Sequence, residues 1–208
     1  MSFTVHARKV RDPSLPQAWR ASALRSCVQL YRPIGFHATL DYLEAKAGPF
    51  ERDEAALLRA LALIESSRAA WHAAIREYDQ ARRDAKREGH RKPRWSGPFS
   101  PTIWYGAPQE AALHAVRYWQ GSQLPALLTR KDQTARALAA CVAACLASEG
   151  GLAPADRETL QVCREELERR LRNRPSGFAD AEYFRVRDLL TVAGLLKTAC
   201  EPVRECRT

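Results

Sequence analysis

Apolar residues recur every three or four positions along most of the 208-residue chain, which is the period of an amphipathic helix. The strongest repeat predicts one long helix over residues 51–88. Arg68 interrupts its apolar seam, and two roles are open for it: its guanidinium reaches solvent while its stem packs, or it sets the register of a partner helix. The other residues of the seam are Leu57, Leu61, Ile64, Trp71, Ile75 and Tyr78.

Shorter periodic segments, bounded by proline, glycine or capping residues, predict the remaining helices. In the first of them the pattern places Trp19 on the buried face together with Leu24, Cys27, Val28 and Tyr31. The fold class is therefore predicted to be all-α: a helical bundle with one long amphipathic helix (about 51–88), a Gly/Pro/aromatic connection and a C-terminal group of shorter helices. These shorter helices are predicted over residues 16–31, 36–47, 108–121, 132–150, 154–172 and 179–199, with a brief apolar turn over 124–128.

The N-terminus departs from the helical period. Residues 2–7 alternate between polar and apolar side chains, as a strand does, and basic residues follow directly at Arg8, Lys9 and Arg11. This pattern predicts a cationic extended arm, or an edge strand that pairs with a partner.

The connection over residues 89–108 contains three glycines and four prolines, which exclude regular helix from most of its length. It also contains four aromatic residues, which argue against a plain disordered linker. The chain is predicted to form a single helical domain over 1–208. A subdivision into an N-terminal part, 1–95, and a C-terminal bundle, 96–208, is also consistent with the pattern.

The formal net charge of +9 lies almost entirely in two short segments. Residues 1–32 carry a net +5, and residues 82–94 carry another +5. Clustered positive charge attracts polyanions, whereas the same charge spread evenly mainly aids solubility.

These two clusters are the candidate nucleic-acid-binding residues. Their cations would neutralise phosphates, and Trp95, with Trp104 or Tyr105, would offer an aromatic face for stacking of unpaired bases. A structural alternative is that the cations are solvated surface and the aromatic residues fix the connection to the core. The candidates are Arg82, Arg83, Lys86, Arg87, Arg91, Lys92, Arg94 and Trp95, with Arg8, Lys9 and Arg11 from the N-terminal arm.

Motifs for catalysis or cofactor binding are not present in the sequence. It contains no phosphate-binding G-x-x-x-x-G-K-[ST], no G-x-G-x-x-G, no H-E-x-x-H and no G-x-S-x-G. Cys141 and Cys145 form half of a metal-site pattern without a second pair, so we interpret them as buried structural thiols. No cofactor, metal or catalytic residue is predicted. Without an apolar run long enough to span a bilayer or act as a signal peptide, the expected location is cytoplasmic.

Together these features predict a non-enzymatic nucleic-acid-binding protein, a subunit or accessory factor of a nucleoprotein complex, that contacts DNA or RNA through the basic helix end and the arm. The alternative is a helical protein–protein interaction module, an adaptor or inhibitor, that binds an acidic protein partner. An enzyme whose site is assembled from dispersed residues is a third, weaker hypothesis.

Overall fold

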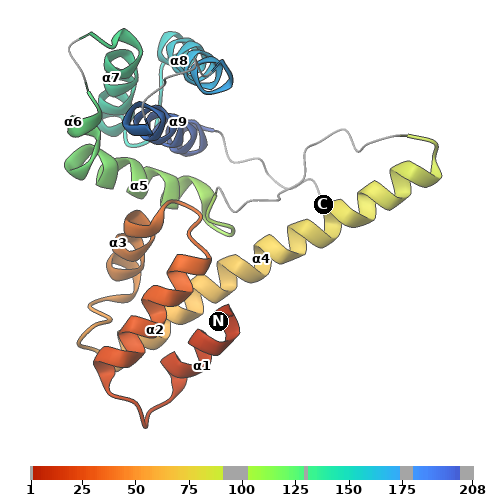
Figure 1. Ribbon diagram of the computed structural model, residues 1–208, viewed down its shortest axis with the longest axis vertical. Coiled ribbons are helices and arrows are strands. Elements are labelled where there is room, and N and C mark those ends of the chain that lie inside the picture. The colour runs from red at the N-terminus through yellow and green to blue at the C-terminus, as the bar shows by residue number, and fades with distance from the viewer. Residues whose placement is uncertain (1, 91–102, 129–130, 174–179, 202–208) are drawn as a thin grey trace. The chain divides into compact units, whose positions relative to one another are not determined.

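The computed structural model describes residues 2–90, 103–128, 131–173 and 180–201 (Figure 1). All regular structure in these ranges is helical, which confirms the all-α prediction. The chain divides into two compact units, residues 1–107 and 108–208, and each is described by itself. No helix among the described residues is both long enough and apolar enough to cross a bilayer.

The described residues of the first unit form four helices. The predicted helix boundaries hold to within three residues because the punctuating residues behave as expected. Asp53 caps α4 by accepting a hydrogen bond from the Ala55 amide. Gly48 ends α3 with a φ of +95°, a left-handed conformation that glycine adopts without strain. The helices are α1 (Phe3–Arg11), α2 (Gln17–Leu30), α3 (Phe36–Ala47) and α4 (Glu54–Arg87).

The prediction of an extended N-terminal arm was wrong, because residues 3–11 form helix α1. Phe3, Ala7 and Val10 are all buried, and their spacing of four and three residues places them on one face of a helix. Residues 2–7, in which polar and apolar side chains alternate, are too few to show the helical spacing of Phe3, Ala7 and Val10. The free energy gained by burying Phe3 and Val10 against α2 and α4 favours the helix over an extended arm.

Arg20 of α2 joins three helices in this unit although it is almost fully buried. Its Nε donates to the Val10 carbonyl at 2.8 Å, which satisfies an acceptor near the C-terminal end of α1. Its Nη1 donates to the Glu54 carboxylate at 2.7 Å, in the first turn of α4. A single guanidinium therefore fixes the end of α1 and the start of α4 to α2.

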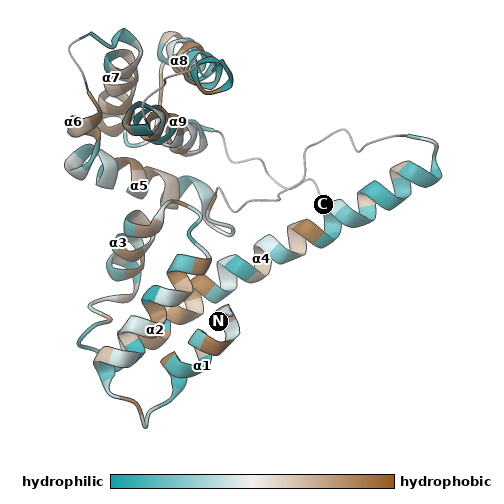
Figure 2. Cartoon of the chain, viewed as in Figure 1, coloured by the Kyte–Doolittle hydropathy of each residue, from teal (hydrophilic) through white to brown (hydrophobic). Residues whose placement is uncertain are grey.

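The apolar seam of α4 is most completely buried in its N-terminal half, where Leu57, Leu61 and Ile64 are inaccessible to solvent, although Tyr78 farther along the helix is also buried. Trp71 continues the seam and stacks against Tyr31 at a ring separation of 5.6 Å. Helix α4 has 34 residues, about 51 Å at 1.5 Å per residue. Its C-terminal half extends beyond α1–α3 and is largely hydrophilic (Figures 1 and 2).

Trp19 is a second correction to the predicted core. Its side chain is 67% exposed, whereas the other four residues predicted beside it are buried. Helix α2 packs through Arg20, Leu24 and Cys27, whereas Trp19, one turn before Ala23, does not belong to this buried face. The sequence pattern predicted Trp19 to be buried because it is apolar, but the arginine next to it is the buried residue.

In the second unit, the residues that the structure describes form five helices, and α9 packs against α5, α6, α7 and α8. Asp132 caps α7 as predicted, since its carboxylate accepts from the Ala135 amide at 3.1 Å. Cys141 and Cys145 are buried, as predicted. The helices are α5 (Pro108–Ser122), α6 (Leu124–Leu127), α7 (Gln133–Ala147), α8 (Pro154–Arg172) and α9 (Asp180–Cys200).

Asp132 is also the centre of a buried ionic network. Its carboxylate accepts from Arg185 of α9 at 2.8 Å and from Arg170 of α8 at 3.0 Å. Burial alone would raise the pKa of Asp132, but the hydrogen bonds from Arg185, the Ala135 amide and Arg170 outweigh burial and lower it. The network therefore connects three helices through one capping residue.

Replacing Arg20 by Met should lower the free energy of unfolding by about 2 kcal/mol, because the Val10 carbonyl is left buried without a donor. Chemical denaturation monitored by circular dichroism measures this change. The matched control is Arg25→Met on the same helix, since Arg25 forms an exposed ion pair with Glu51 and its loss should cost under about 0.5 kcal/mol. Equal effects of the two substitutions would contradict the role of Arg20.

Replacing Asp132 by Asn should destabilise the second unit by about 3 kcal/mol at neutral pH, because Arg170 and Arg185 lose their shared counter-charge. The folded pKa is lowered, so this stabilisation is complete above the ordinary value of 3.8 and is lost as pH falls through the folded pKa. Urea unfolding at pH 7 and at pH 3 measures both quantities. The gap between wild type and variant should narrow at pH 3, while Asp188→Asn, in an exposed pair with Arg187, should show little effect at either pH.

Candidate nucleic-acid interface

The predicted basic helix end is present in the structure as the last turns of α4. Arg82, Arg83 and Lys86 are exposed there and form no ion pair with any described residue. They line a surface hollow of about 400 Å³ together with Asp79. Arg87 is less free, because its guanidinium pairs with Asp84 at 2.5 Å.

A second cationic surface lies in the groove between α1 and α4, with a volume of about 510 Å³. Helix α1 contributes Arg8 and Arg11 to its walls, and α4 contributes Arg68, His72 and Arg76. Glu65 supplies the single carboxylate of the lining, and it forms an ion pair with Arg11. Four arginines thus face one glutamate across an open groove.

The helical register of α4 joins the groove to the helix end. Residues separated by three, four or seven positions share a helix face. Asp79 lies on this face of α4, between Arg76 and Arg83. Among the basic residues, counting in these steps from Arg68 leads through His72 and Arg76 to Arg83 and then Lys86. We call these five residues of α4, together with Arg8 and Arg11 of α1, the cationic stripe.

The cationic stripe is about 27 Å long from Arg68 to Lys86, at 1.5 Å per residue. B-form DNA rises 3.4 Å per base pair, so a stripe of this length matches roughly eight base pairs. It also exceeds the Debye length of about 8 Å at physiological ionic strength. The cations at its two ends are therefore largely screened from each other.

Other predicted residues stand outside the stripe. Lys9 is exposed but does not line the groove. Arg82 lines the hollow with Arg83 and Lys86 but does not line the groove either. Arg91, Lys92, Arg94 and Trp95 lie outside the described residues.

The two aromatic residues considered with Trp95 are held within the first unit. Trp104 is 4% exposed and meets the Tyr42 ring edge-on, with centroids 4.9 Å apart. Tyr105 is half-buried, and burial raises the pKa of its hydroxyl. Trp104 therefore fixes its segment to the core, and its face is not free to stack on a base.

Arg68 makes a contact that neither option raised by the sequence includes. Its guanidinium carbon lies 4.6 Å from the centroid of the Phe3 ring, within the range of a cation–π contact. The residue therefore packs against α1 of its own chain and also forms part of the groove wall.

The sequence pattern did not predict the groove. Arg68, His72 and Arg76 are spaced at four-residue intervals, which signals a shared face of one helix. The arginines of α1 could not be placed beside them, because the N-terminal segment was expected to be extended.

His72 responds to the charge around it. Burial and the nearby Arg68 and Arg76 guanidinium groups together lower the pKa of its imidazole. Arg8 and Arg11 of α1 and Glu65 of α4 also face this groove. The pKa of the His72 imidazole therefore reports the electrostatic potential in the groove.

Comparisons with known protein families, with curated proteins and with solved structures found no match. Within the described residues, no group of three or more His, Cys, Asp or Glu side chains is arranged to hold a metal ion.

Replacing Arg76 by Gln should raise the pKa of His72 toward its ordinary value of 6.5, because one of the two neighbouring cations is removed. Titration of the imidazole by NMR measures the pKa directly. Arg82→Gln is the control, since Arg82 does not line the groove and its removal should leave the pKa of His72 unchanged. An unchanged value in Arg76→Gln would contradict the geometry described for the groove.

Proposed function

We propose that the protein is a non-enzymatic nucleic-acid-binding factor that contacts the phosphate backbone through the cationic stripe. The observation that carries the proposal is the continuity of Arg8, Arg11, Arg68 and Arg76 with Arg83 and Lys86 along one side of α4. Contacts of this kind neutralise phosphates and release counterions without reading base edges. We therefore expect binding with little sequence preference.

The balance of charge supports a polyanionic ligand over a neutral one. Arg76, Arg83 and Lys86 have no acidic partner among the described residues, although Asp79 and Asp84 are on the same helix. Like charges three or four positions apart destabilise a helix slightly. A row of such cations that the fold does not neutralise is consistent with neutralisation by a ligand.

A second candidate is binding of an acidic protein partner, and one observation favours it. Trp19 and Leu30 are 67% and 51% exposed, and their separation of eleven residues places them on one face of α2. Exposed tryptophan is common at the energetic centre of protein interfaces. In this alternative, the apolar contact would come from α2 and the stripe would pair with carboxylates.

The triple variant Arg76→Gln, Arg83→Gln, Lys86→Gln should weaken binding to DNA or RNA by at least about ten-fold at low salt. Fluorescence anisotropy with single- and double-stranded oligonucleotides, repeated across a salt series, gives the affinity and its salt slope. Each lost phosphate contact should reduce the slope by about 0.9 for a duplex or about 0.7 for a single strand.

The matched control is the triple variant Lys131→Gln, Arg136→Gln, Arg172→Gln, which removes the same charge from exposed positions in the second unit. Its salt slope should stay close to that of wild type. The proposal fails if wild type does not bind any oligonucleotide at low salt, or if both triple variants lose affinity equally. The protein-partner alternative is favoured if Trp19→Ala abolishes capture of an acidic protein while oligonucleotide binding is absent.

A further inference from the structure

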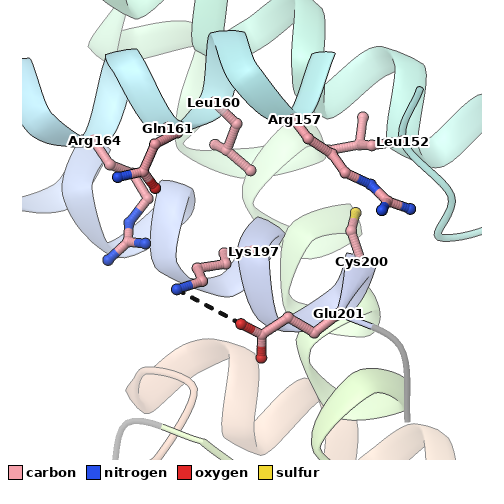
Figure 3. A pocket seen from close by; sticks show the side chains of 8 residues that line it. All are labelled: Leu152, Arg157, Leu160, Gln161, Arg164, Lys197, Cys200 and Glu201. Atoms are coloured by element: carbon pink, nitrogen blue, oxygen red, sulfur yellow. Dashed lines mark ion pairs between the residues drawn. The ribbon is translucent and has the colours of Figure 1, made fainter. Parts of the chain in front are cut away.

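A small pocket lies between α8 and α9 in the second unit, remote in sequence from the cationic stripe (Figure 3). Its volume is about 190 Å³. Helix α8 contributes Arg157, Leu160 and Arg164 to the lining, and α9 contributes Lys197 and Cys200. The sequence pattern does not indicate that these residues share a site.

The lining of the pocket has an excess of positive charge. Arg157, Arg164 and Lys197 face one carboxylate, that of Glu201. Glu201 pairs with Lys197 at 3.6 Å, as the dashed line in Figure 3 marks. Arg157 has no ion pair within the described part of the chain, and Arg164 pairs only with Glu168, at 3.6 Å, a residue that does not line the pocket.

Arg164 has hydrogen-bonding capacity that its own fold does not use. Its Nε is buried and has no hydrogen-bond partner among the described residues. Its terminal nitrogen lies 3.6 Å from the Glu168 carboxylate, which is too long for a strong hydrogen bond. Buried polar groups in folded proteins are nearly always hydrogen-bonded, so an exception at the wall of a pocket indicates a place for an acceptor.

The dimensions and the apolar wall restrict the ligand further. A cavity of about 150 Å³ is sufficient to hold benzene, so the observed volume of about 190 Å³ suits a molecule of similar or slightly larger size. Leu152 and Leu160 provide an apolar surface beside the cations. Arginine's planar fork suits an oxyanion such as a carboxylate or a phosphate ester.

We propose that this pocket binds a small organic oxyanion, in which a single carboxylate or phosphate group meets Arg164 and a tail of a few carbon atoms meets Leu160 and Leu152. The inference does not depend on nucleic-acid binding by the first unit. Cys200 contributes its thiol to the same lining, which supplies a local probe of occupancy.

Isothermal titration of the full-length protein with butanoate and with propyl phosphate tests the proposal, and 1-butanol serves as the uncharged analogue. Buffers of about 20 mM salt are appropriate because screening weakens charge pairing. At least one of the two anions should bind saturably, and 1-butanol should bind at least about ten-fold more weakly because it cannot form the charge-assisted hydrogen bonds. The anion that binds more tightly shows whether the pocket prefers a carboxylate or a phosphate head group.

Arg164→Gln should weaken anion binding at least about ten-fold, and Arg164→Lys should weaken it less, because lysine keeps the charge but lacks the planar fork. Arg136→Gln, at an exposed position of α7 outside the pocket, is the matched control and should bind as wild type does. Oligonucleotide binding should be unchanged in Arg164→Gln, which separates this site from the cationic stripe.

Protection of Cys200 from a neutral maleimide, followed by mass spectrometry, places the ligand and remains informative if Arg164→Gln does not fold. Saturating anion should slow modification of Cys200. The proposal is overturned if neither anion binds, if 1-butanol binds as tightly as the anions, if Arg164→Gln and Arg136→Gln behave alike, or if the bound anion leaves Cys200 unprotected.

Discussion

The buried guanidinium of Arg20 is the interaction on which the arrangement of the first unit depends. It bonds to the Val10 carbonyl near the end of α1 and to Glu54 at the start of α4. With Phe3, Ala7 and Val10 buried, this contact holds α1 alongside α4. The groove exists because α1 is held there, and Arg8 and Arg11 consequently lie beside Arg68 and Arg76.

The first unit separates a stabilising half of α4 from a charged half. Leu57, Leu61 and Ile64 are buried against the other helices, and burial of each such side chain contributes about 1.5–3 kcal/mol. Like-charged neighbours along the stripe each oppose the helix by only about 0.2–0.5 kcal/mol. The apolar half of the helix therefore outweighs the repulsion in its cationic half, which permits a surface that favours a polyanion.

The second unit uses arginine in two contrasting ways. Arg170 and Arg185 are satisfied by Asp132 and by Glu166 and Glu182 respectively, so their charges serve the packing of α7, α8 and α9. Arg164 lies six residues before Arg170 on the same helix, yet its Nε has no hydrogen-bond partner among the residues that the structure describes. On α8, Arg170 therefore stabilises the packing of the helices, whereas Arg164 keeps a hydrogen-bond donor that a ligand could use.

The sequence by itself determined the all-α class, the long helix and most helix ends, because proline, glycine and capping residues such as Asp132 act locally. It also located the cations at Arg82, Arg83 and Lys86. Only the tertiary structure decided that residues 3–11 are helical, that Trp19 is exposed and that Arg68 packs on Phe3. Each of these depends on contacts between residues distant in sequence, which a local periodicity does not report.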